Sequence, residues 1–179
     1  MRVHSSFVGV LVVATCVVAS PAQAQVTKEQ VPGVTNFARV QTTVACAGAI
    51  KAEAVADLKQ MGFKSVINLR LASEQGADVD AEAAAATAAG VNYVHIPFAG
   101  AMADPSVVDT FLTAVTNPAN EPAFIHCASG NRAAAMWLVK RVQIDKWDVN
   151  KAGDEAAALG LTNPQLKQFA LNYIEAHKK

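Results

Sequence analysis

The stretch that decides the fold is Ala123-Phe-Ile-His-Cys-Ala-Ser-Gly-Asn-Arg132, which continues into the apolar run Ala133–Val142. Its first four residues have the composition of a buried strand, small residues follow Cys127, and Arg132 stands at the first turn of an apolar helix. A strand, a tight loop and a helix start present successive backbone N–H groups, and the positive end of the helix dipole, to whatever lies above the loop. The stretch therefore predicts a cradle for an anion.

The loop also encodes a nucleophile and a cation. Arg132 supplies a two-pronged guanidinium for oxyanions, and the same positive field should favour the thiolate of Cys127. A buried, inert thiol is the alternative for Cys127. His126 is expected to orient the loop and the thiolate by hydrogen bonding, or else to be a packed residue at a strand end. The predicted binding set is His126 with the backbone of Ala128, Ser129, Gly130 and Asn131.

The pattern of His126, Cys127, Gly130 and Arg132 resembles the signature of the cysteine-based phosphatases. Two features depart from that signature. Four residues separate Cys and Arg where the phosphatases usually have five, and Ala133 stands where they usually carry Ser or Thr. Four intervening residues are typical of many rhodanese-type sulfurtransferases.

The chain is most similar in these respects to the bacterial beta-lactamase-hydrolase-like phosphatase domains, small relatives of the dual-specificity phosphatases with a short loop. The resemblance extends from about Gly33 to Ile174 and includes the segments Lys64–Arg70 and Val91–Pro97. It implies hydrolysis of phosphate monoesters through a cysteinyl-phosphate. It also implies that the loop containing Asp104 supplies the acid for the leaving group. From the residues alone, Asp104 is equally well the N-cap of the helix that Pro105 opens.

Two other functions fit the same residues. In a rhodanese-like sulfurtransferase, Cys127 would carry a persulfide and the short loop would hold a sulfur donor. In a non-catalytic anion-binding or redox-sensing module, the loop would still bind an anion but would not catalyse a reaction. The predicted catalytic residues, Cys127, Arg132 and Asp104, belong to the phosphatase hypothesis.

The N-terminus has the three parts of a secretory signal: Arg2 near the start, the apolar run Phe7–Ala19, and Ala22-Gln-Ala24 before an expected cleavage. The apolar run is too short to span a bilayer. We therefore predict a signal peptide over 1–24, a disordered leader over 25–32 and one phosphatase-like domain over 33–179. The mature protein would be periplasmic or secreted and would not be held at the membrane.

The mature chain would carry 14 basic and 15 acidic residues, so no general attraction to nucleic acid is expected. No histidine, cysteine or carboxylate cluster has metal-ligand spacing, and neither a metal nor a cofactor is predicted. The predicted partner is a phosphorylated substrate. Export would expose Cys46 and Cys127 to an oxidising compartment. The two thiols could then pair, Cys127 could depend on a thiol reductase, or Cys46 could be an unpaired core residue.

Apolar periodicity predicts strands and helices in alternation. This pattern indicates a three-layer α/β fold with a mostly parallel central sheet, in which 123–126 lies centrally and the active loop lies at a carboxyl strand end. Arg70 and Glu74 are expected to form an ion pair that pins a loop. The expected strands are 37–40, 42–45, 65–69, 91–96 and 123–126, and the expected helices are 49–61, 80–89, 105–115, 133–142, 149–159 and 166–174.

Overall fold

The computed structural model describes residues 25–40 and 42–178. A six-stranded sheet in the order β1-β2-β3-β6-β4-β5 forms its centre. β3, β6, β4 and β5 run parallel to one another. β1 and β2 add an antiparallel edge beside β3. The strands are β1 (Val26–Lys28), β2 (Ala38–Val40), β3 (Val44–Ala47), β4 (Ser65–Asn68), β5 (Asn92–His95) and β6 (Ala123–His126).

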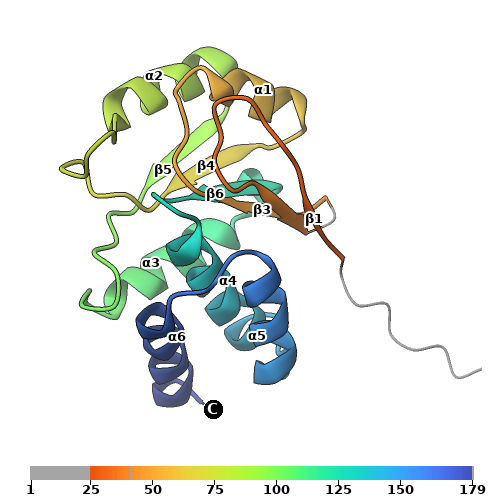
Figure 1. The fold of residues 1–179 in the computed structure, drawn as a ribbon, viewed down its shortest axis with the longest axis vertical. Helices are drawn as coiled ribbons and strands as arrows, with labels where there is room; N and C mark the ends of the chain where they lie inside the picture. The colour runs from red at the N-terminus through yellow and green to blue at the C-terminus, as the bar shows by residue number, and fades with distance from the viewer. Residues whose placement is uncertain (1–24, 41, 179) are drawn as a thin grey trace, which may run out of the picture.

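Helices cover both faces of this sheet, which confirms the predicted three-layer architecture (Figure 1). α1 (Ala54–Gln60) and α2 (Val79–Ala89) lie on one face. The other face carries α3 (Ser106–Val115), α4 (Asn131–Gln143), α5 (Val149–Ala158) and α6 (Pro164–Ala176), and a short 3-10 turn, η1 (Pro118–Asn120), precedes β6. None of the helices in the described part of the chain combines the length and apolar character needed to cross a membrane.

β6 lies between β3 and β4, as predicted, and its side chains alternate between the two faces. Phe124 packs in the core under α1 and α2, whereas Ile125 packs in the core formed with α3 to α6. The anion loop thus continues from the most enclosed strand of the sheet into α4, whose residues Ala133–Val139 are all buried. Ile67, Phe124 and Trp137 are all buried in the core.

The prediction of a disordered leader over 25–32 is wrong in part. Val26–Lys28 forms the edge strand β1, which pairs with Ala38–Val40 of β2. β1 is held by backbone hydrogen bonds to β2 and buries little side-chain surface. Its three residues therefore lack the alternating apolar pattern from which a strand can be predicted. The predicted signal peptide lies outside the described residues.

Smaller differences concern the ends of helices. α1 begins at Ala54 rather than at residue 49, because Ala49–Lys51 is held by backbone hydrogen bonds to Ala128 and Gly33 instead. α4 begins at Asn131, two residues before the apolar run that predicted it. Arg132 therefore lies in the first turn of α4, as predicted, and the loop comprises Cys127 to Gly130.

Candidate active site

The loop between β6 and α4 is fixed against the end of β3. The Cys127 N–H donates to Ala47 O at 3.2 Å, and the Ala49 N–H donates to Ala128 O at 3.0 Å. Gly130 has a φ of 96°, a left-handed conformation in which glycine is favoured. A Cβ on Gly48 would lie 2.9 Å from Ala128 O, so this neighbour of the loop must also lack a side chain.

The sulfur of Cys127 accepts a hydrogen bond from within its own loop. The Gly130 N–H donates to Cys127 Sγ at 3.1 Å, and only 1% of the Cys127 surface is exposed. The tight turn therefore directs one of its own backbone N–H groups at the sulfur.

Arg132 closes the loop, and its guanidinium is held from several sides. It donates to both carboxylate oxygens of Glu74, at 2.6 and 2.7 Å, and to two main-chain carbonyls, Phe98 O at 2.7 Å and Leu69 O at 3.1 Å. The charge of Arg132 also interacts with the thiol of Cys127. Arg132 is therefore oriented before any ligand arrives.

Glu74 joins the two arginines. Its hydrogen bond from Arg132 is the main reason why the pKa of Glu74 falls to about 2. The predicted ion pair with Arg70 is confirmed at 3.3 Å, and Arg70 also donates to the carbonyls of Gln75 and Gly76. The ion pair fixes the loop 70–76, as expected. In this position Glu74 also holds the guanidinium of Arg132.

His126 is fully buried and belongs to a polar network under the sheet. Its Nε2 lies 3.1 Å from Glu82 Oε2, and the same oxygen accepts from Asn68 Nδ2 at 2.7 Å and from the Tyr93 hydroxyl at 2.9 Å. Burial is the main cause of a raised pKa for Tyr93. His126 thus orients the end of β6 from the face opposite α4, and its ring does not face the loop's outer surface.

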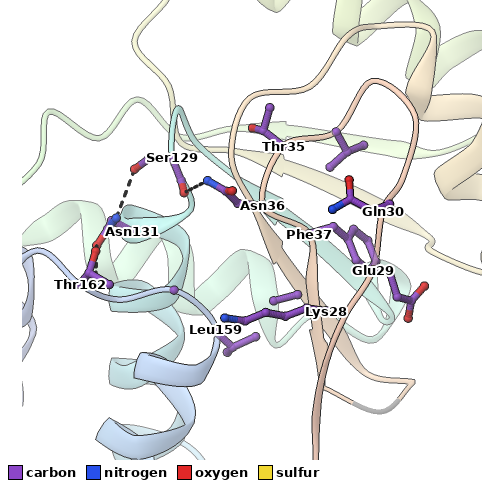
Figure 2. A pocket seen from close by; sticks show the side chains of 13 residues that line it. Lys28, Glu29, Gln30, Thr35, Asn36, Phe37, Ser129, Asn131, Leu159 and Thr162 are labelled. Atoms are coloured by element: carbon purple, nitrogen blue, oxygen red, sulfur yellow. Dashed lines mark hydrogen bonds between the residues drawn. The ribbon is translucent and has the colours of Figure 1, made fainter.

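Two asparagine side chains tie the loop to other segments (Figure 2). Asn36 Nδ2 donates to Ser129 O at 3.1 Å. Asn131 Oδ1 accepts from the N–H groups of Thr162 and Asn163, both at 2.7 Å. The predicted binding residue Asn131 therefore directs its side chain toward the α5–α6 connection.

Two cavities adjoin the loop and share Ser129 and Asn131. The smaller has a volume of about 410 Å³ and includes Arg132 in its lining, together with Ala99–Ala101 and the start of α6. The larger, about 680 Å³, lies between the β1–β2 segment and the α5–α6 connection (Figure 2). A ligand bound at the loop therefore has space on two sides.

Asp104 lies at the exposed end of the segment after β5. Its Oδ1 accepts from the Ser106 N–H at 2.8 Å, but the N-cap residue of α3 is Pro105, so the prediction that Asp104 is the N-cap is wrong by one residue. That hydrogen bond lowers the pKa of Asp104. Asp104 is not among the residues that line the cavity beside Arg132, although Ala99–Ala101 of the same segment are. Its role as an acid stays a prediction.

Cys46 is a buried core residue in β3, and it and Cys127 are both free thiols in the described structure. Burial raises the pKa of the Cys46 thiol, and the nearby charges of Cys127 and Glu155 add to this effect. Within the described residues, no group of three or more histidine, cysteine or carboxylate side chains could hold a metal ion.

Sequence reasoning missed Glu82, Asn36 and the contact between Glu74 and Arg132. Glu82 was visible only as a carboxylate in an alanine-rich helix, where its spacing could not show that it faces the sheet. Asn36 lies 93 residues before the carbonyl to which it donates. Such contacts depend on the assembled fold and have no local pattern.

Comparison with known proteins places this site in a family. The sequence profile of the beta-lactamase hydrolase-like protein, phosphatase-like domain, matches residues 36–144. The beta-lactamase hydrolase-like protein of Xylella fastidiosa is 28% identical over 123 residues, which are 68% of this chain and 27% of that protein. The chain thus spans about a quarter of the curated relatives' length.

Solved structures share the fold. P. aeruginosa TpbA superposes with a TM-score of 0.65 at 21% identity, covering 89% of this chain and 94% of TpbA. The catalytic core of the PP-IP phosphatase SIW14 from S. cerevisiae gives a TM-score of 0.64 at 20% identity, covering 82% and 93%. With more than half of its length matched by the profile, the chain belongs to the family of beta-lactamase hydrolase-like protein, phosphatase-like domains.

Proposed function

We propose that the protein is a cysteine-dependent phosphatase that hydrolyses phosphate monoesters through a cysteinyl-phosphate. The observation that carries the proposal is the Gly130 N–H directed at Cys127 Sγ, in a loop that ends in a guanidinium held in advance by Glu74. The loop thus combines a candidate nucleophile with a clamp for the oxygens on which charge develops. Membership of a phosphatase-like family supports the same reaction.

In the first step, the thiolate of Cys127 attacks phosphorus, an S–P bond forms and the P–O bond to the leaving group breaks. Arg132 and the loop N–H groups hold the remaining phosphoryl oxygens. The leaving oxygen takes a proton, for which Asp104 is the proposed donor. In the second step, water attacks the cysteinyl-phosphate, and inorganic phosphate and the free thiol are released.

Asp104 can act in this way only if the segment that carries it moves toward the loop. Its carboxyl group is exposed and bonded to its own helix, and its lowered pKa favours the ionised form at neutral pH. Substrate-induced closure of such segments is common, and it would bring Asp104 next to the leaving oxygen.

The proposal is tested with p-nitrophenyl phosphate and the reduced protein. Release of p-nitrophenol that disappears in Cys127→Ser, together with acid-quench trapping of a phosphorylated Cys127 in the wild type, supports the mechanism. Cys46→Ser is the matched control, because it changes the other buried thiol of the described chain and should leave turnover in place. Turnover that survives in Cys127→Ser would contradict the proposal.

A sulfurtransferase is the second candidate, favoured by the four residues between Cys127 and Arg132. Thiocyanate formation from thiosulfate and cyanide, with no phosphatase activity, would establish it instead. If neither reaction occurs and phosphate still raises the melting temperature, the chain is an anion-binding module.

We also propose that the protein is exported and works in the periplasm or outside the cell. The support is the N-terminal charge, apolar run and Ala-Gln-Ala24 site. A mature N-terminus at Gln25 in the periplasmic fraction would support export, and a full-length cytoplasmic protein would refute it. A thiol reductase would then keep Cys127 reduced, and activity that falls in a reductase-deficient strain would test this.

A further inference from the structure

One buried carboxylate oxygen joins the ends of two neighbouring strands on the face of the sheet that α2 covers (Figure 1). Glu82 is only 2% exposed, and its Oε2 accepts from Asn68 Nδ2 and from the Tyr93 hydroxyl. Because this oxygen acts as an acceptor, His126 Nε2, 3.1 Å away, is the ring nitrogen that donates to it. Asn68 and His126 are partners in the register of β4 and β6, so both side chains reach the oxygen from one face.

The first arm of this network leads to the proposed nucleophile. His126 Nδ1 is buried and has no hydrogen-bond partner among the described residues. The contact with Glu82 is therefore the polar interaction that orients the imidazole within this part of the chain. His126 directly precedes Cys127, so the orientation of its side chain bears on the place where the sulfur leaves the strand.

The second arm leads to the cation of the loop. Asn68 Oδ1 accepts from the Arg70 N–H at 2.7 Å, which turns the amide Nδ2 of Asn68 toward Glu82. Arg70 begins the loop in which Glu74 binds both terminal nitrogens of Arg132. The same buried oxygen thus contacts the strand that ends at the thiol and the strand that leads to the holder of the guanidinium.

From these contacts we propose that Glu82 is a positioning residue, whose buried oxygen sets the place of Cys127 relative to the guanidinium of Arg132. This inference rests on the proposed function and deepens it. Glu82 lines neither cavity beside the loop, so it acts through its partners and not on the ligand. Its position matters because a reacting atom that is misplaced by ~1 Å can lower a rate by as much as ~10²-fold.

Two variants separate the position of the oxygen from its charge. Glu82→Asp keeps the carboxylate and retracts it by one methylene, whereas Glu82→Gln keeps an oxygen acceptor at the original reach. We expect kcat for p-nitrophenyl phosphate to fall by ~10-fold in Glu82→Asp and by less than about threefold in Glu82→Gln. Ser65→Ala is the matched control, because the buried Ser65 hydroxyl donates to Asn120 O at the opposite end of β4. It should lower stability and retain kcat.

A second readout needs no turnover. In a Cys46→Ser background, the reduced protein is alkylated at Cys127 with iodoacetate, whose carboxylate can bind in the anion loop, and with neutral iodoacetamide. The ratio of the two rates cancels the intrinsic reactivity of the thiol and reports how the anion clamp lies relative to the sulfur. The ratio should fall by ~10-fold in Glu82→Asp and by less than about threefold in Glu82→Gln, and it should not change in Ser65→Ala.

The ratio decides the inference. It is overturned if the ratio is unchanged in Glu82→Asp, or if Glu82→Gln lowers the ratio as much or more, because charge would then matter more than position. Should Glu82→Asp fail to fold, Asn68→Ala breaks the second arm and is judged by the same ratio. If the wild type does not hydrolyse p-nitrophenyl phosphate, the proposed function fails and the ratio still tests the positioning. If hydrolysis occurs and the ratio is unchanged in Glu82→Asp, the positioning fails and the function stands.

Discussion

The loop that contains Cys127 and the segment that contains Asp104 both follow a parallel strand at the same edge of the sheet, yet they are built differently. The first is tied to β3, to Asn36 and to the α5–α6 connection, and it enters the most deeply buried helix. The second is largely exposed between Gly100 and Pro105, and Met102 within it is 92% exposed. Asp104 is bonded only to the start of its own helix.

The difference fits the two roles that we propose for these segments. Binding an oxyanion requires donors in fixed positions, because reorganisation during the reaction costs free energy. Delivering a proton to a leaving group allows a segment that closes over the substrate and opens again. The anchored loop is thus ready without a ligand, whereas the second segment has the exposure and few contacts that motion requires.

The largest effect is expected from Arg132→Lys, which changes the cation of the anchored loop. Lysine cannot form the paired contact with Glu74 or grip two phosphoryl oxygens at once, so kcat/KM for p-nitrophenyl phosphate should fall by ~10²–10³-fold. Arg39→Lys is the control, since Arg39 stacks on Phe63 away from the loop and should retain near wild-type turnover. If kcat/KM falls by less than about fivefold in Arg132→Lys, the paired N–H groups of the guanidinium are unimportant for this reaction.

The exposed side is tested by Asp104→Asn. Asparagine can still accept from the Ser106 N–H, so the variant removes the ionisable group and keeps this contact at the start of α3. Turnover of an alkyl phosphate should fall by ~10²-fold, and turnover of p-nitrophenyl phosphate, whose leaving group needs little protonation, should fall much less. Asp78→Asn is the control, because Asp78 also accepts a backbone N–H at the start of a helix, that of Ala81 in α2. Identical losses for the two substrates would assign Asp104 to its contact at the start of α3 alone.

Asn131→Ala would loosen the anchored loop without touching the thiol or the guanidinium. The N–H groups of Thr162 and Asn163 lose their acceptor, so we expect a stability loss of ~1–2 kcal/mol and a fall in kcat of about tenfold. Asn150→Ala, at the exposed start of α5, is the control for an asparagine in a first helical turn. Denaturant unfolding and steady-state kinetics measure the two effects. Unchanged kcat with reduced stability would show that the anchor serves only the fold.

The smallest expected effect concerns acid stability. Ion pairing with Arg132 lowers the pKa of Glu74 from 4.5 to about 2, so its stabilising contribution is present above pH 4.5 and is lost as the pH falls toward 2. Unfolding free energies should therefore decrease more steeply over this range in the wild type than in Glu74→Gln. Glu53→Gln, which changes an exposed carboxylate, should retain the wild-type slope. Parallel curves for wild type and Glu74→Gln would contradict the role of this pair.

The sequence was sufficient for the sheet, the layers and the loop because their signals are local. The segments 65–69 and 123–126 have the composition of buried strands, and both form strands with a neighbour on each side, β4 and β6. Gly130 predicted the turn, and its left-handed φ requires the small residue. Four successive residues thus specify the turn that directs an N–H at sulfur.

What could not be predicted depends on long-range packing. Glu82 reaches His126 only because α2 lies across β6, and β1 forms only because β2 is available for pairing. The distance of Asp104 from the cavity likewise depends on how its segment leaves the sheet. The spacing of residues along the chain does not show which of them meet in the folded protein. The resemblance to a family suggests what a residue does but not where its side chain lies.

The continuity of the loop with α4 has a consequence for amide hydrogen exchange. The Ala134 N–H is bonded to Gly130 O, and the helix that follows is buried from Ala133 to Val139. The turn therefore cannot open by fraying, and the amides that are hydrogen-bonded at its two ends, those of Cys127 and Ala134, should exchange with deuterium only when the whole domain unfolds. Heat inactivation and global melting should then coincide, so that the folded fraction at a given temperature equals the active fraction.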